Sequence, residues 1–431
     1  YLTVLIERPK RLRIPSASIQ QHVKLTSPKI RITMTARVEF SWILPGGRRH
    51  LLLLLLLLSS PAAAQETAGV WLGSAPICGA HQSSSCHKLD LLFDRLDSAG
   101  DGSTCWTGSK VFCRAKTLSK RLDSTDAGRL TIVSYNVFAR PYLVSHDGQR
   151  ERTCRIPRAL LAEVPGADAI VFQEAFQPGC LADSSDTFSL RGLLRSYGFN
   201  YSTRTVGVRR WGLRINGGVF VASRWPILQQ AQAVYLNAHP GSADSLANKG
   251  VVHAKIDKLG SVFHLFGTHL QAEDGPEFDA YREKQADELH RFAQSRQISP
   301  NEPVIFAGDF NADLLANRGH VSRLLQRLNA RLPRLRGPLR STYDPKQNDV
   351  VEPGITVRQW LDYVFVSREH KQPVSSSIRA VRLLADAPVN LCISAPFQPS
   401  YVAPDSSGCN ARLRTRHLSD HFPVVGEFRF Q

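Results

Sequence analysis

Two residues that could contact a phosphate group or a metal ion follow a short apolar run, Val304–Ala307. Asp309 and Asn311 stand two positions apart, and on an extended chain this spacing turns both side chains to the same face. An amide can donate to an anionic oxygen, while a carboxylate can handle a proton or a cation. The pair therefore suits phosphoryl chemistry. The alternative is an Asx turn that only closes the strand.

Similar polar residues stand at the ends of other apolar runs, which favours chemistry over a turn. They are Asn136 after 130–135, Glu174 after 169–172, His269 after 262–266, Asp362 at the start of 361–366, and Asp420 and His421 directly before 422–430. Catalytic sites commonly collect such residues from several strands, and this set suits metal-assisted phosphoester hydrolysis. Mg²⁺ prefers carboxylate oxygen, which makes Glu174 the best single ligand, and the two histidines can titrate near neutral pH.

The elements that must position these residues begin at Arg129, where strand-like runs start to alternate with helical ones. Helices are predicted over 156–163, 277–296 and 321–332, and further strands over 217–222 and 249–256. This alternation predicts a layered α/β sandwich with helices outside packed sheets.

The motifs at the strand ends resemble the endonuclease/exonuclease/phosphatase superfamily. They are Ser134–Asn136, Gln173–Glu174, Gly267–His269, Gly308–Asn311, Leu361–Tyr363 and Ser419–His421, and their order and spacing match throughout 129–431. Within that superfamily, Ala243–Val251 and Thr268–Asp274 resemble the secreted sphingomyelinase C (neutral sphingomyelinase) branch. The resemblance implies a four-layered, DNase-like fold of two packed sheets flanked by helices. It also implies hydrolysis of sphingomyelin to ceramide and phosphocholine.

The resemblance further implies a role for each site residue. Glu174 is the expected ligand of Mg²⁺, or of another divalent cation such as Co²⁺ or Mn²⁺, with Asn136 and Asp420 beside the metal. His421 is the expected general base, oriented by Asp362. His269 and Asn311 are expected to bind phosphoryl oxygens, and Asp309 to lie next to the attacking water. Whether Asp309 or His421 takes the proton of that water stays open.

The chain has 431 residues and a formal net charge of +17. Residues 1–64 account for +8 of this charge, and the remaining +9 is compatible with either nucleic acid or an anionic membrane. The only methionine, Met34, precedes three arginines, eight leucines at 51–58 and Ala62–Ala64. This pattern is typical of a secretory signal over 34–64, with cleavage near Gln65. The alternative is a membrane anchor, but the apolar run is short for a membrane span and small residues follow it. Residues 1–33 are then interpreted as upstream translation, and the mature protein as extracellular.

All eight cysteines follow the signal, as expected for an oxidising compartment. The segment 65–128 holds Cys78, Cys86, Cys105 and Cys113, which predict a small extension with two disulfides in one of three pairings. In the catalytic domain, 129–431, the predicted pairs are Cys154 with Cys180 and Cys392 with Cys409.

The loop between Cys392 and Cys409 contains Phe397 and Tyr401, which could touch a membrane surface. The alternative is an ordinary packed loop. In the bacterial relatives a hairpin near this place carries membrane-touching aromatics, but here the prolines at 396, 399 and 404 disfavour a regular hairpin. The basic run from Arg323 to Arg340 is interpreted as a solvated face, and the alternative is a contact with anionic lipid or nucleic acid.

Together these observations predict a monomeric, Mg²⁺-dependent sphingomyelin phosphodiesterase that takes its substrate from a phospholipid membrane and needs no stable protein partner. One alternative is a secreted DNase-like endonuclease, which would act on nucleic acid. The other is a membrane-binding protein that keeps the fold without chemistry.

Overall fold

The computed structural model describes residues 69–73, 75–80, 86–87, 91–100, 103–114, 126–142, 144–176, 179–181, 187–207, 215–351, 354–394 and 407–431. The predicted upstream segment and signal, 1–64, lie outside these residues. Among the residues that are described, no helix combines the length and apolar character needed to cross a membrane.

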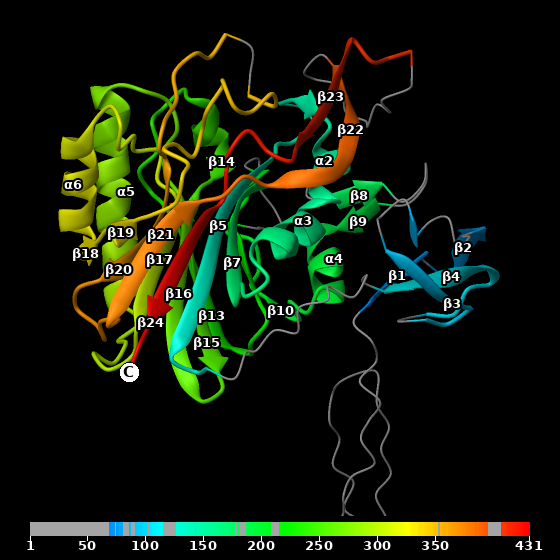
Figure 1. Ribbon diagram of the computed structural model, residues 1–431, viewed down its shortest axis with the longest axis horizontal. Helices are drawn as coiled ribbons and strands as arrows, with labels where there is room; N and C mark the ends of the chain where they lie inside the picture. The colour runs from blue at the N-terminus through cyan, green and yellow to red at the C-terminus, as the bar shows by residue number, and fades with distance from the viewer. Residues whose placement is uncertain are drawn as a thin grey trace, which may run out of the picture. The chain divides into compact units, whose positions relative to one another are not determined.

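Two mixed β-sheets pack against each other at the centre of residues 129–431 (Figure 1). In spatial order, the first contains β10 (Tyr201–Ser202), β12 (Phe220–Ser223), β7 (Ala169–Ala175), β5 (Arg129–Ala139), β24 (Val424–Arg429), β21 (Ser375–Ala380) and β19 (Arg334–Leu335). The second contains β13 (Ile227–Val234), β15 (Gly250–Lys258), β16 (Ser261–His269), β17 (Val304–Asp309), β20 (Asp362–Ser367) and β18 (Ala330–Arg331). Their facing side chains, among them Val171, Val219 and Val364, form a fully buried apolar core.

Helices cover the outer faces of both sheets (Figure 1). Helices α5 (Pro276–Gln294) and α6 (Arg318–Arg327) lie on one side, while α2 (Gln149–Thr153), α3 (Ile156–Glu163) and α4 (Leu190–Ser196) lie on the other. The four-layered sandwich predicted from the sequence is therefore confirmed.

Several predicted boundaries shift in the structure. Helix α3 has the predicted ends, whereas α6 stops at Arg327 instead of 332 because the chain turns at Asn329, whose φ is +44°, into strand β18. The predicted strand 217–222 begins only at Phe220, after Gly218 with a φ of +68°. The short strands β8 (Gly179–Leu181), β9 (Thr187–Ser189), β11 (Ile215–Asn216) and β14 (Ala247–Asn248) and the 3₁₀ turn Ala243–Leu246 carry no clear sequence pattern.

A third sheet adjoins the segment between Cys392 and Cys409. Strands β22 (Leu384–Ser394) and β23 (Ala411–His417) pair antiparallel as a hairpin, and β6 (His146–Asp147) adds to its edge. The expectation that Pro396, Pro399 and Pro404 disfavour a regular hairpin in this loop stays a prediction, because residues 395–406 lie outside the described part of the chain. A disulfide joins Cys392 to Cys409, which is the predicted pair. Phe397 and Tyr401 lie outside the described residues.

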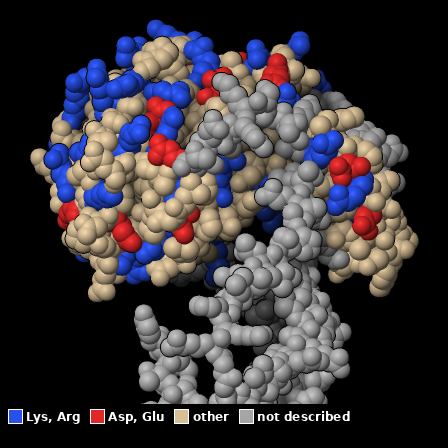
Figure 2. All heavy atoms as spheres, turned by 60° about the horizontal axis from the view of Figure 1, so that its bottom comes forward, with Lys and Arg blue, Asp and Glu red and all other residues tan. Residues whose placement is uncertain are grey.

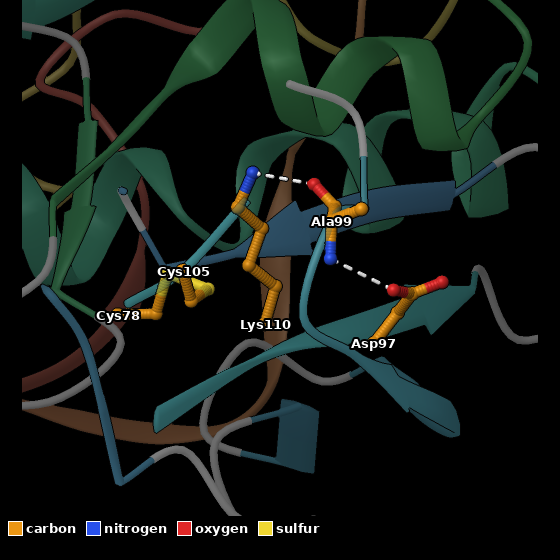
Figure 3. The surroundings of a disulfide bond; sticks show 5 residues. All are labelled: Cys78, Asp97, Ala99, Cys105 and Lys110. Carbon is orange, nitrogen blue, oxygen red and sulfur yellow. Dashed lines mark hydrogen bonds between the residues drawn. A yellow bond between two sulfur atoms is a disulfide. The ribbon is translucent and has the colours of Figure 1, made fainter. Parts of the chain in front are cut away.

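The cysteine-rich extension forms a small sheet of β1 (Gly69–Leu72), β2 (Ile77–Ala80), β3 (Leu92–Asp97) and β4 (Thr107–Arg114). Disulfides join Cys78 to Cys105 and Cys86 to Cys113, which selects one of the three possible pairings. Figure 3 shows the first disulfide beside a turn that two hydrogen bonds hold. Lys110 donates to the carbonyl of Ala99 (2.8 Å), and the Ala99 amide donates to Asp97 Oδ1 (2.8 Å).

The basic run is a solvated face, as expected. Arg323 and Arg327 of α6 pair with Glu283 of α5 at 2.6 and 2.8 Å, and Arg327 also pairs with Asp287 at 2.7 Å. Arg331 donates to Gln372 and Ser376. Figure 2 shows basic side chains spread over the visible face with acidic ones among them. Such exposed pairs contribute little to stability, but those of Arg323 and Arg327 link α6 to α5.

Two buried histidines in the second sheet give a testable pH dependence of stability. His253 and His264 stack with their ring centroids 5.1 Å apart and a 2.9 Å contact between Nε2 and Nδ1. Burial lowers the pKa of His253 to about 3. The unfolded chain takes up this proton near pH 6.5, so the stability is fully present above pH 6.5 and is lost as pH falls toward 3.

We expect the free energy of unfolding to fall by about 2 kcal/mol between pH 6.5 and pH 5.0 through His253 alone, at about 1.4 kcal/mol per pH unit. The measurement is urea unfolding of the wild type and His253→Gln at pH 7.5 and 5.0. The variant should lose about 2 kcal/mol less than the wild type over this range. Equal losses in both proteins would show that His253 is not held neutral.

Candidate active site

The strand directions place all the predicted site residues at one edge of the two sheets. Strands β5 and β7 are parallel, as are β16 and β17, so Asn136, Glu174, His269 and Asp309 lie near their carboxyl ends. Strands β20 and β24 run antiparallel to these neighbours and present the residues at their starts to the same edge, namely Asp362, Asp420 and His421. The backbone register sets Asp309 opposite His269 on one side and Asp362 on the other.

Asp309 is the centre of the site, and its Oδ2 atom faces three other side chains. Asn136 Nδ2 donates to it at 3.0 Å, His269 Nε2 lies 3.7 Å away, and His421 Nε2 lies 3.9 Å away. Its Oδ1 accepts the amide of Asn311 at 2.9 Å, the Asx turn that was the alternative interpretation of this stretch. The turn and the site are therefore the same structure. Asn311, with φ of +49°, bends the chain directly after the carboxylate.

Asn136 connects two carboxylates of the site, those of Glu174 and Asp309. Its Nδ2 donates to Glu174 Oε1 and to Asp309 Oδ2, both at 3.0 Å, and its Oδ1 accepts the amide of Phe138 at 3.1 Å. The bond from Phe138 fixes which end of the amide faces the site. Asn136 therefore turns its NH₂ group, not its oxygen, toward Glu174. This orientation suits holding carboxylates or contacting a phosphate oxygen.

His421 and Asp362 form a buried imidazole–carboxylate pair. His421 Nδ1 lies 2.8 Å from Asp362 Oδ2, and both residues are at most 7% exposed. Burial alone lowers the pKa of His421, but the charges of Asp362 and Asp420 outweigh it and raise the pKa well above its ordinary value. The ring edge of Tyr343 also packs against His421, with centroids 5.3 Å apart. The pair leaves Nε2 facing Asp309, where a base or acid could act.

Three carboxylates in the pocket are held in an unfavourable electrostatic environment. Burial and the charge of Asp420 raise the pKa of Glu174 to about 7, and burial and the charge of Asp362 raise the pKa of Asp309 to about 6. The pKa of Asp420 is also raised, chiefly by burial. A bound cation would relieve this repulsion.

Glu174 is the residue that best fits a divalent cation. Its Oε2 is buried and has no hydrogen-bond partner among the described residues, whereas Oε1 accepts from Asn136. The backbone φ of Glu174 is +50°, a left-handed conformation that L-residues rarely adopt and that is common at functional sites. A buried carboxylate oxygen without a donor is what a hard cation such as Mg²⁺ would satisfy.

A second arrangement of possible ligands comprises Asp309, Asp362 and His421, whose ligand atoms lie within 4.8 Å of one another. The short contact between His421 and Asp362 already engages two of these groups with each other. This internal hydrogen bond is typical of a proton-transfer pair, so Glu174 is the better candidate for the metal.

The two predicted phosphate-binding residues differ in the hydrogen bonds that they already make. His269 is buried, and burial together with the charges of Lys249 and His421 lowers its pKa well below the ordinary value. It is therefore neutral, and its Nδ1 lacks a partner among the described residues. Asn311 Nδ2 already donates one of its two N–H groups to the carbonyl of Leu270 at 3.1 Å, which leaves the second N–H for a phosphate oxygen.

The site also depends on residues for which the sequence gives no individual prediction. Ser419 Oγ donates to the carbonyl of Asn136 at 2.7 Å and also contacts Asp420 at 3.1 Å. Lys249 is buried, pairs with Asp244 at 2.6 Å and donates to the Leu270 carbonyl at 2.7 Å. Lys249 and Asp244 lie within the stretch Ala243–Val251, whose resemblance to one branch of the superfamily was the only available signal.

The other predicted disulfide of the catalytic domain, between Cys154 and Cys180, is described only in part. Cys154 is disulfide-bonded. The side chain of Cys180 lies outside the described part of the chain, so its pairing with Cys154 stays a prediction.

Residues 133–421 match the Endonuclease/Exonuclease/phosphatase family, and the chain belongs to it. It is 32% identical over 278 residues to a sphingomyelinase C 2 from Leptospira interrogans, covering 60% of this chain and 42% of the relative. It is 31% identical over 279 residues to a phospholipase C from Staphylococcus aureus, covering 60% of this chain and 78% of the relative. The chain thus spans less than half the length of the Leptospira relatives.

Solved structures of two similar proteins share the fold. One is a double mutant of the beta toxin from Staphylococcus aureus with bound magnesium ions, with a TM-score of 0.56, 25% identity, and coverage of 69% of this chain and 98% of that one. The other is sphingomyelinase C from Streptomyces griseocarneus, with a TM-score of 0.55, 26% identity, and coverage of 69% and 99%. The predicted resemblance to the sphingomyelinase C branch is confirmed.

Proposed function

We propose that this protein is a Mg²⁺-dependent phosphodiesterase that hydrolyses sphingomyelin to ceramide and phosphocholine. The observation that carries the proposal is the convergence on Asp309 of one amide and two imidazoles. The same amide also holds Glu174, whose Oε2 has no hydrogen-bond partner in the described part of the chain. The names of the relatives, sphingomyelinase C and phospholipase C, support the substrate class.

The reaction requires a base for water and positive or donor groups for the phosphate oxygens. His421 is assigned as the base, and Asp362 holds its Nδ1 so that Nε2 faces the water beside Asp309. His269 and Asn311 donate to the phosphoryl oxygens as negative charge builds in the transition state. His421 must lose its proton before it can act as a base, which requires that the negative charge near it be neutralised.

Glu174 is assigned as the main metal ligand, with Asp420 close by and Asn136 holding Glu174 in place. When bound, Mg²⁺ would neutralise the carboxylates and polarise a phosphate oxygen. Mn²⁺ or Co²⁺ could replace it, because both accept carboxylate oxygen.

The setting proposed for this activity is extracellular, at the surface of a phospholipid membrane, by a monomer. Three disulfides in the described residues are consistent with an oxidising compartment. The apolar run 51–58 with its basic flank supports secretion.

The test is a parallel assay of the protein beginning at Gln65 in one Mg²⁺ buffer. Phosphocholine release from sphingomyelin vesicles is measured beside nicking of supercoiled plasmid, each with and without EDTA. The proposal predicts phosphocholine release that EDTA abolishes and little nicking. Nicking without phosphocholine release would favour the endonuclease. Vesicle binding without either activity would favour a non-enzymatic membrane protein.

A further inference from the structure

Arg152 is a fully buried cation that the proposed chemistry does not use. It lies in helix α2, its side chain is 0% exposed, and its guanidinium makes five hydrogen bonds. A guanidinium has five N–H donors. Burying a charged group is costly unless it is paired and hydrogen-bonded. The complete set of partners offsets this cost, and it indicates that the guanidinium fixes the positions of the groups that it contacts.

Three of the five bonds of Arg152 go to two segments that carry different parts of the active site. Nη1 donates to the carbonyls of Val137 (3.1 Å) and Leu418 (2.9 Å), which are separated by 281 positions. Val137 directly follows Asn136, and Leu418 directly precedes Ser419–His421. Arg152 Nη1 therefore links the end of β5 to the turn that carries Asp420 and His421.

The remaining donors fix the guanidinium and the bend after Asn136. Nη2 donates to the carbonyl of Phe138 and to Asp147 Oδ1 (2.7 Å), and Nε donates to the Asp147 carbonyl (3.0 Å). Phe138 has a φ of +50°, a conformation that L-residues adopt only where their surroundings hold them. Asp147 supplies a formal counter-charge in direct contact and lies on β6, at the edge of the β22–β23 hairpin.

We propose that Arg152 is a positioning residue that sets the separation between the Asn136–Glu174 half of the active site and the His421–Asp362 half. The 2.7 Å bond from Ser419 Oγ to the Asn136 carbonyl links the same two segments. A lysine could not replace Arg152, because an ammonium group lacks the planar fork that reaches both carbonyls and Asp147 together. This inference rests on the proposed function, since it concerns the reaction at that site.

The test compares Arg152→Lys with a matched control, Arg224→Lys. Arg224 also donates to two carbonyls from different segments, Ala167 (2.8 Å) and Tyr197 (3.0 Å). It lies at the opposite end of β7 from Glu174, because Ala167 precedes that strand. Both substitutions remove guanidinium–carbonyl bonds, but only one removes them at the active site. kcat, KM and thermal stability are measured for sphingomyelin hydrolysis with saturating Mg²⁺.

We expect kcat of Arg152→Lys to fall by about 30-fold or more with KM changed less than about threefold, because misplaced groups weaken transition-state contacts more than substrate binding. Arg224→Lys should keep kcat within about twofold of the wild type, even if it is less stable. A folded Arg152→Lys protein with kcat within about threefold of the wild type would overturn the inference. Equal kcat losses in both variants would also overturn it, because they would indicate a general loss of stability.

If Arg152→Lys does not fold, Asp147→Asn provides the same test, since it keeps an acceptor oxygen but removes the charge that anchors Arg152. The same kcat-selective loss, here about threefold to tenfold, is expected, and an unchanged kcat would contradict the inference. If the wild type itself does not hydrolyse sphingomyelin, the proposed function fails. The inference is then decided by crystal structures of the wild type and the folded variant. An unchanged distance between the Asn136 and His421 side chains would overturn it.

Discussion

His421→Ala is expected to lower kcat for sphingomyelin hydrolysis by about 10³-fold or more while leaving the protein folded. His421 is the histidine whose one nitrogen is held by Asp362 at 2.8 Å and whose other nitrogen faces Asp309 at 3.9 Å. Its removal takes away the proposed base and leaves Asp362 as a buried carboxylate without its partner. The measurement is steady-state phosphocholine release with saturating Mg²⁺, beside a thermal melt.

The matched control is His290→Ala. His290 lies on α5, pairs at 3.4 Å with Glu369, and lies outside the site, so its variant should keep wild-type kcat. If His421→Ala retains more than about a tenth of the wild-type kcat, His421 is not the base. The role would then pass to Asp309, the other candidate for the proton of water.

Glu174→Gln is expected to abolish Mg²⁺-dependent activity and to remove Mg²⁺ binding measured by calorimetry. Glutamine keeps the size of the side chain but not the charge that a hard cation requires. The same substitution should leave the metal-free protein at least as stable as the wild type at pH 8. Burial raises the pKa of Glu174 to about 7, so the charged carboxylate destabilises the metal-free fold above that pH.

Glu163→Gln, at the exposed end of α3, is the control and should change neither metal binding nor kcat. Mg²⁺ binding to Glu174→Gln with wild-type affinity would show that the ion is bound elsewhere. A marked loss of stability in metal-free Glu174→Gln would contradict the electrostatic argument, because it would mean that the charge contributes to the fold.

Much of the site could be predicted from the sequence because strand ends are local features. Asp309, Glu174 and His421 each stand beside an apolar run, and β-sheet geometry brings such ends to one edge. The motif order then supplied the resemblance to the family.

The orientations and supports of the site residues could not be predicted, because they depend on contacts between distant segments. The bond from Phe138 that turns the Asn136 amide nitrogen inward depends on a backbone bend that no sequence pattern marks. Arg152 resembles any helical arginine in the sequence, yet it contacts Leu418, 266 positions away. Strands β22 and β23 were not predicted, because they flank a segment that carries Pro396, Pro399 and Pro404 and was interpreted as a loop.

The central claim is that a cation at Glu174 stabilises the phosphate while a base at His421 activates the water that attacks it. The alternative ligand set of Asp309, Asp362 and His421 would place the metal where the base should be. The most direct test is an anomalous diffraction map of crystals soaked in Mn²⁺. We expect a peak within coordination distance of Glu174 Oε2, with the His421–Asp362 hydrogen bond intact. A peak between Asp309, Asp362 and His421, with Glu174 unoccupied, would contradict the account.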